Sequence, residues 1–178
     1  MLDRIIYRTK QLLFALTAKM TEEDNIFVRQ YLDIKEASLF FSLPEYEQKH
    51  CVTVARRMFA ESRDKKNLDG RKIIRLGLLH DIGKAAIRLS LLNKGFMVII
   101  KRIANPFYNL FAKMGESEKS NPFFRKFYVH KHHGHIGSEM LKRIGESADI
   151  VNEVAMHDEP VTSHDAYMQI LDQADSSY

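Results

Sequence analysis

The spacing of apolar residues limits this chain to a helical fold. Apolar side chains recur at intervals of three and four residues along the whole sequence, and the sustained alternation typical of strands is not seen. We therefore predict an all-α fold. The prediction divides the chain into a helical extension over residues 1–43 and one helical domain over residues 44–178.

Capping residues and prolines predict where individual helices begin. Thr21 and Asp24 have the spacing of an acidic capping box, and Pro44 suits the first turn of a helix that ends near residue 62. Residues 71–80 are strongly apolar and predict a buried helix. Further helices are expected over residues 1–20, 85–104, 122–130, 138–144 and 147–158.

Glycine and proline predict the breaks between these helices. A turn at Gly134 or Gly137 is expected to interrupt the helical pattern in the third quarter of the chain. Pro160 is expected to close one helix, and Thr162 and Ser163 are expected to begin the last one.

Composition excludes several classes of protein. A chain of 178 residues can bury one core without disulfides, and its single cysteine, Cys51, allows neither an internal disulfide nor a site made of several thiolates. A reducing, cytoplasmic compartment fits this composition best. The 27 Lys and Arg against 23 Asp and Glu give a net charge of +4, which suits an anionic ligand but does not predict nucleic-acid binding.

The most apolar region, residues 87–104, is interrupted by four cations, so we expect no membrane span. These cations are Arg88, Lys94, Lys101 and Arg102. The favoured interpretation is the solvated side of a core-facing helix, and contact with a membrane surface or a phosphate-rich ligand is the alternative. The longer stretch over residues 85–128 is rich in aromatic residues, which are expected chiefly to pack a core, with a lid or ligand wall as the alternative.

Histidine and aspartate residues are concentrated on several predicted helices. They are His50, His80 with Asp81, the run His130, His132, His133 and His135, then His157, and Asp172 with Asp175. Imidazole and carboxylate groups that face the core from separate helices suit a metal site. This donor set fits divalent iron, manganese, nickel, cobalt or zinc, and one carboxylate can bridge two ions.

Five elements in this order resemble the HD-domain metal-dependent phosphohydrolases, and within them the HDIG branch. Residues 48–55 read Q-K-H-C-V-T-V-A and residues 78–84 read L-L-H-D-I-G-K, which is the most specific element. Residues 133–141 read H-G-H-I-G-S-E-M-L, residues 154–157 read V-A-M-H, and residues 174–175 read A-D. No G-Y-P follows His157, so the chain does not resemble the cyclic-di-GMP phosphodiesterase branch.

The resemblance implies an all-helical fold around one or two divalent metal ions. It implies that His50, His80, Asp81 and Asp175 hold the first ion, and that Asp81 bridges to a second ion held by His133 and His157. Lys84 matches the lysine of the family that contacts phosphate, so Asp81 and Lys84 are the expected catalytic residues. His132 and His135 remain alternatives to His133, and Asp172 remains the alternative to Asp175.

The resemblance also implies a reaction, in which a metal-bound hydroxide attacks a phosphate ester. The expected partner is a small phosphorylated substrate, and a nucleotide is the favoured one. Two other functions are retained. One is a di-iron oxygenase built on the same ligand set, and the other is a signalling module that binds metal and nucleotide without turnover.

Overall fold

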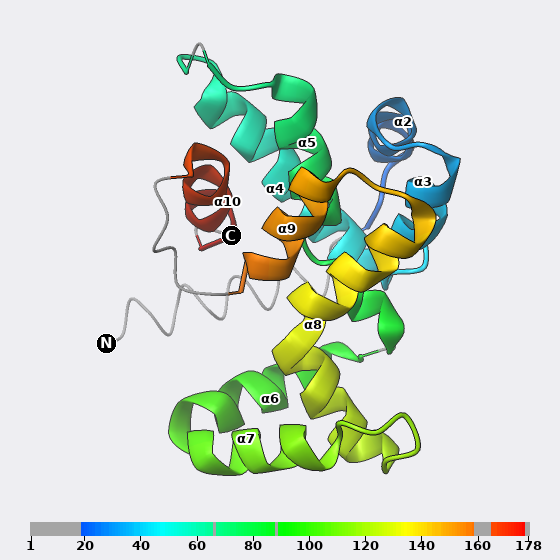
Figure 1. Cartoon of the computed structure of the whole chain (residues 1–178), viewed down its shortest axis with the longest axis vertical. Coiled ribbons are helices and arrows are strands. Elements are labelled where there is room, and N and C mark those ends of the chain that lie inside the picture. The colour runs from blue at the N-terminus through cyan, green and yellow to red at the C-terminus, as the bar shows by residue number, and fades with distance from the viewer. Residues whose placement is uncertain (1–18, 66, 88, 159–164, 177–178) are drawn as a thin grey trace.

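Every regular element in the described part of the computed structural model is a helix, as Figure 1 shows, so the all-α prediction is confirmed. The structure describes residues 19–65, 67–87, 89–158 and 165–176. Its elements are α2 (Glu22–Tyr31), α3 (Ile34–Phe40), α4 (Glu45–Ser62), α5 (Gly70–Leu79), the 3-10 helix η1 (Ile82–Ala86), α6 (Leu91–Ile103), α7 (Asn105–Met114), α8 (Pro122–Ile144), α9 (Ala148–Met156) and α10 (Ala166–Ser176).

Some sequence predictions lie outside the described residues. They are the helix over 1–20, the cation at Arg88, the helix end at Pro160, and the helix start at Thr162 and Ser163. Within the described residues, no helix combines the length and hydropathy that a bilayer crossing requires.

The main core lies between α4 and α5, which cross at close range. A Cβ on Gly77 of α5 would lie 2.6 Å from the Cα of Ala55 in α4, so only glycine permits this approach. The apolar stripes of both helices are buried at the crossing. Members of this core include Val52, Met58, Ile73, Leu76 and Leu79.

Helices α2 and α3 pack against the same core. Val28 and Phe40 are fully buried in it. The capping box predicted at Thr21 and Asp24 is present, with both reciprocal hydrogen bonds. The division of the chain between residues 43 and 44 stays a prediction, while the packing makes α2 and α3 part of one hydrophobic core with α4 and α5.

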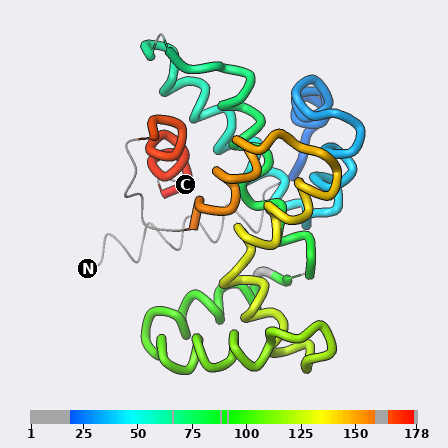
Figure 2. The backbone as a smooth tube through the Cα atoms, in the orientation of Figure 1, coloured from blue at the N-terminus to red at the C-terminus, as the bar shows by residue number. Residues whose placement is uncertain are grey.

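A second lobe is formed by α6, α7 and the first half of α8, at the bottom of Figures 1 and 2. Its small core contains Met97, Tyr108, Ala112 and Phe127. Helix α8 runs from this lobe into the main one, where it packs on η1 and α9. The two lobes are therefore joined by α8, which is kinked at His132.

Two sequence predictions about helix ends are wrong. The helix expected from residue 85 begins at Leu91, because η1 occupies residues 82–86, Ile87 is extended, and Ser90 caps α6. The turn expected at Gly134 or Gly137 is absent from α8, which continues through both residues and departs from helical geometry at His132. These glycines serve close packing instead, since a Cβ on Gly137 would lie 2.9 Å from the backbone nitrogen of Gly83.

Candidate metal centre

Four helices bring the predicted histidine ligands to one buried point. His50 lies on α4, His80 caps the C-terminal end of α5, His133 lies on α8, and His157 caps the C-terminal end of α9. Asp81 follows His80 directly and is the N-cap residue of η1. The fold thus gathers residues that the sequence spreads over more than half of the chain.

Asp81 lies at the centre of these histidines, and its two carboxylate oxygens face different pairs. Oδ2 lies 3.5 Å from His50 Nε2 and 3.4 Å from His80 Nε2. Oδ1 lies 3.0 Å from His133 Nε2 and 3.5 Å from His157 Nε2. Two groups of potential metal ligands therefore share one buried carboxylate.

Asp175 on α10 reaches the first of these groups. Its Oδ1 lies 3.0 Å from His50 Nε2 and 3.9 Å from His80 Nε2, although the side chain is 43% exposed. Its alternative, Asp172, lies on the exposed side of the same helix. The structure therefore places Asp175, and not Asp172, beside the two histidines.

Among the histidines of α8, the structure brings only His133 to Asp81. The ring of His132 lies 4.7 Å from that of Tyr128, and His135 is exposed. His133 is buried and faces the carboxylate. That these six residues bind metal stays a prediction, and the geometry favours His133 and Asp175 over their alternatives.

Backbone carbonyls orient three of the imidazole rings. Each Nδ1 lies within hydrogen-bond distance of the carbonyl three residues earlier, at 2.9 Å for His80, 3.1 Å for His133 and 2.7 Å for His157. Because a carbonyl only accepts, Nδ1 donates the hydrogen and Nε2 is left to bind a ligand on the side of Asp81. This is the usual orientation of a metal-ligating histidine.

The converging atoms fit a divalent cation. Nε2 of His133 and Nε2 of His157 are only 3.2 Å apart, and both lie near the Asp81 carboxylate. Nε2 of His80 is buried and hydrogen-bonds to no described residue. Lone pairs and a carboxylate repel one another at such distances, and a metal ion among them would turn this repulsion into attraction.

Charges around the centre favour the ionised form of Asp81. Burial raises the pKa of Asp81, but Lys84 and His80 outweigh burial and hold this pKa well below its ordinary value. Burial lowers the pKa of His80, but the Asp81 carboxylate raises it to about 9. Metal binding at His80 would therefore release a proton. Burial lowers the pKa of His50 and of His133, which keeps both rings neutral near pH 7.

Comparison with protein families gives one match, in which a model described as HD domain covers residues 48–177. The chain belongs to the HD domain family. The matched residues include all six predicted ligands and Lys84. HD domains bind divalent metals, and most are metal-dependent phosphohydrolases. The HDIG branch stays a prediction. Comparisons with curated proteins and with solved structures gave no significant match.

Lys84 of the HD domain lies beside the centre within a network of charges. Its Nζ contacts Asp81 Oδ2 and lies 3.7 Å from Glu47 Oε2. Glu47 is almost fully buried and also pairs with Lys94 of α6, at 2.7 Å. Burial raises the pKa of Glu47, but Lys84 and Lys94 lower it to about 2. Two cations therefore border one side of the centre.

Sequence reasoning missed two carboxylates of this HD domain. Glu47 lies on α4 three residues before His50, and Asp158 directly follows His157. Asp158 Oδ2 lies 3.0 Å from His133 Nδ1 and accepts a hydrogen bond from the Gly134 nitrogen at 3.3 Å. Glu47 lies one helical turn from His50, so its spacing could have placed it on the same face of α4. Neighbouring residues do not share a face, so the position of Asp158 directly after His157 gives no such signal.

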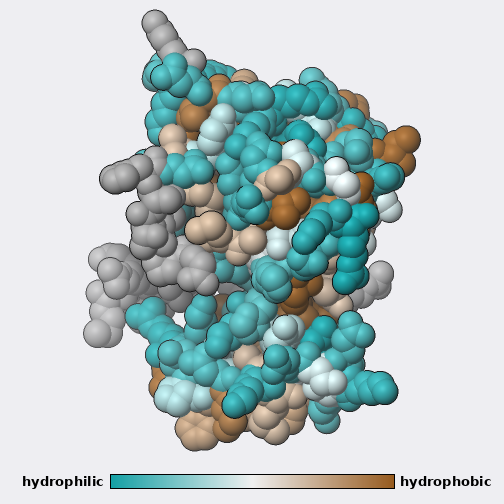
Figure 3. All heavy atoms as spheres, in the orientation of Figure 1, coloured by the Kyte–Doolittle hydropathy of each residue, from teal (hydrophilic) through white to brown (hydrophobic). Residues whose placement is uncertain are grey.

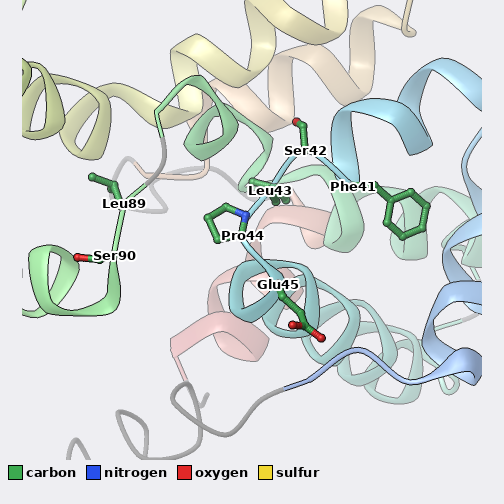
Figure 4. Close-up of a pocket in the computed structure, with 7 residues that line it drawn as sticks. All are labelled: Phe41, Ser42, Leu43, Pro44, Glu45, Leu89 and Ser90. Carbon is green, nitrogen blue, oxygen red and sulfur yellow. The ribbon is translucent and has the colours of Figure 1, made fainter.

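A pocket of about 500 Å³ opens elsewhere on the HD-domain protein, where the α3–α4 connection meets the segment before α6 (Figure 4). It is lined by Phe41, Ser42, Leu43, Pro44, Glu45, Leu89 and Ser90. None of the six predicted ligands borders it.

Proposed function

We propose that this HD-domain protein is a metal-dependent phosphohydrolase that cleaves a phosphate ester, with a nucleotide as its substrate. The observation that carries the proposal is the division of the two Asp81 oxygens between two pairs of histidines. His50, His80, Asp81 and Asp175 would hold one ion, and Asp81, His133 and His157 would hold a second. When bound, such ions would polarise the phosphate and supply a water nucleophile at neutral pH.

The chain's own residues would bind and orient the substrate. Lys84 lies where its ammonium group can donate to a phosphate oxygen that approaches Asp81. Glu47 holds Lys84 and Lys94 on that side of the centre, and its burial fixes both cations there. The carbonyls that accept from the three Nδ1 atoms keep the rings in place during turnover.

The same cations favour phosphate chemistry over the two other functions. Lysine side chains beside the ligands suit a phosphoryl group, whose negative oxygens they can stabilise in the transition state. A binding module without turnover needs no shared carboxylate between two ligand groups. We propose a nucleotide as the substrate. We also propose a cytoplasmic location, because the single cysteine, Cys51, is a buried free thiol, which suits a reducing compartment.

The test begins with metal-free protein reconstituted separately with manganese, iron, cobalt, nickel and zinc. Each form is assayed with p-nitrophenyl phosphate, bis(p-nitrophenyl) phosphate and a panel of nucleoside mono-, di- and triphosphates. Asp81→Asn keeps the shape of the side chain and should abolish phosphate release. Lys84→Ala should lower the rate by about a hundredfold or more, because it removes one donor to the phosphate.

His135→Ala is the matched control, because this histidine lies on α8 near His133 but is exposed. It should retain the rate of the unmodified protein. Oxygen consumption by the iron-loaded form, with no phosphate release under any metal, would favour the oxygenase. Tight nucleotide binding without phosphate release under any metal would favour the signalling module.

A further inference from the structure

Helix α6 exposes an apolar stripe along its length. Leu92, Phe96, Ile99 and Ile103 follow one another at intervals of four, three and four residues, so they share one face of the helix. Their exposed fractions are 86%, 46%, 55% and 75%. This face is not the core face of the lobe, because Met97 of the same helix fills that role and is 1% exposed.

Helix α7 repeats this arrangement. Phe107, Leu110 and Met114 are spaced by three and four residues, and about half of each side chain is exposed. The core of the lobe is filled by Tyr108 and Ala112, which point to the other side of α7. Figure 3 shows hydrophobic surface along the lower edge of this lobe. Exposed apolar surface of this extent marks an interaction site.

All charged residues of the same segment are cations. None of the 23 Asp and Glu residues lies between Asp81 and Glu116, whereas six Lys and Arg do. Lys101 and Arg102 are exposed in the last turn of α6, and Lys113 is exposed in the last turn of α7. Arg102 and Lys113 flank the apolar faces of α6 and α7, whereas Lys101 lies on the opposite side of α6, with its Nζ 5.8 Å from the centre of the Tyr108 ring. Apolar side chains flanked by cations, with no carboxylates among them, match a surface that is apolar inside and anionic outside.

We propose that the lobe formed by α6 and α7 docks on the surface of an anionic lipid bilayer. The exposed apolar side chains would enter the boundary between headgroups and acyl chains, and Arg102 and Lys113 would contact the phosphates. Self-association through the same face is disfavoured, because it would bring the cations of one copy against those of another. This inference does not depend on the proposed phosphatase activity.

The test uses the full chain and sedimentation with sucrose-loaded vesicles. Vesicles of phosphatidylcholine alone are compared with vesicles that also contain phosphatidylglycerol. The protein should sediment with the anionic vesicles, and added salt should weaken binding. The double change Arg102→Glu and Lys113→Glu should weaken binding by about tenfold or more.

The chain offers a matched control for each part of the lobe. Lys142 and Arg143 are two exposed cations in the last turn of α8, outside this lobe, so reversing both charges should leave vesicle binding unchanged if the lobe makes the contact. Ile103→Glu should weaken binding, and Ile34→Glu, at a 90% exposed position of the main lobe, should not. All these positions are exposed, and circular dichroism verifies that each variant folds.

A fluorescent reporter locates the contact directly, because the chain has no tryptophan. Leu92→Trp should shift its emission to shorter wavelength on anionic vesicles, while Ile34→Trp should not. Absence of sedimentation with anionic vesicles would overturn the proposal. So would equal effects of the lobe variants and their controls. If the protein does not bind vesicles but forms dimers without lipid, and Ile103→Glu dissociates these dimers, the apolar face binds a second copy of the chain instead.

Discussion

Gly83 of η1 and Gly137 of α8 pack backbone against backbone. A Cβ added to Gly83 would lie 1.9 Å from the carbonyl oxygen of His133 and 2.6 Å from the nitrogen of Gly137. This contact fixes η1, and with it Asp81, against the part of α8 that carries His133. The distance of 3.0 Å between Asp81 Oδ1 and His133 Nε2 thus depends on two residues with no side chain.

Gly83→Ala should therefore separate η1 from α8. We expect a loss of about 3 kcal/mol in the free energy of unfolding, because backbone atoms cannot move aside as a flexible side chain would. We also expect weaker metal binding at the pair formed by His133 and His157. Urea unfolding and metal titration of the purified variant measure the two effects.

Gly95→Ala is the control for this change. Gly95 lies inside α6, and a Cβ there would meet no atom within 4 Å. Alanine should stabilise the helix at this position by up to about 1 kcal/mol. If Gly83→Ala and Gly95→Ala lowered the free energy of unfolding by similar amounts, the contact between Gly83 and Gly137 would have no special role.

Asp81→Ala should remove both metal ions, because each group of ligands uses one oxygen of this carboxylate. Elemental analysis should find about two ions per chain in the unmodified protein and none in the variant. His157→Ala should lose one ion and keep the one held by His50, His80 and Asp175. His135→Ala should lose none. A full complement of metal in Asp81→Ala would contradict the shared-carboxylate arrangement.

Asp24 predicts a pH dependence of stability that is separate from the metal centre. Its buried carboxylate pairs with Lys49 at 2.5 Å and with Arg56 at 2.9 Å, which connects α2 to α4. Burial raises the pKa of Asp24, but the hydrogen bonds from Lys49 and Thr21 outweigh burial and lower it below 3.8. A lowered pKa in the folded state stabilises the protein above the ordinary value, and this stabilisation is lost as the pH falls through the folded-state pKa.

Asp24→Asn should accordingly lower the free energy of unfolding by about 2 kcal/mol near pH 7. The difference from the unmodified protein should persist to about pH 5 and shrink below about pH 4. Urea unfolding over this pH series measures it. Asp64→Asn, at an exposed position, should change stability by less than about 0.5 kcal/mol. A difference in unfolding free energy that grows toward low pH would contradict the lowered pKa of Asp24.

Tyr108→Phe tests the connection between the second lobe and the centre. The buried Tyr108 hydroxyl lies 2.7 Å from His130 Nδ1, and His130 supplies the carbonyl that accepts from His133. Loss of the hydroxyl leaves a buried ring nitrogen unpaired, which should cost about 1–2 kcal/mol of unfolding free energy. Thermal unfolding measures this loss. Tyr128→Phe is the control, because the Tyr128 hydroxyl hydrogen-bonds to no described residue. The unfolding free energy of this variant should stay nearly unchanged.

The sequence predicted best what local interactions determine. The capping box at Thr21 and the helix over 45–62 depend on contacts within a few residues, and both are present. Gly134 and Gly137 were misinterpreted because a glycine that breaks a helix and a glycine that admits a neighbouring backbone look the same in one sequence. Only the positions of η1 against Gly137 and of α9 against Gly134 distinguish the two uses.

The ligands were found through the resemblance and not through spacing alone. Four histidines lie within residues 130–135, and it is the folded structure that shows His133 facing Asp81. The spacing of Glu47 to His50 could indicate only a shared face of α4, because the role of Glu47 comes from Lys84 and Lys94, which approach it from other elements. Metal binding itself stays a prediction that elemental analysis can test.

The dispersal of the ligands has a consequence for folding. His50 and His157 are separated by more than half of the chain, and Asp81 meets both only after α4, α5, α8 and α9 have docked. No single helix can retain the ion, so a nascent chain gains little from metal until its last long-range contacts close. Metal uptake would then report the completion of tertiary structure, and a chelator would selectively destabilise the finished molecule rather than its parts.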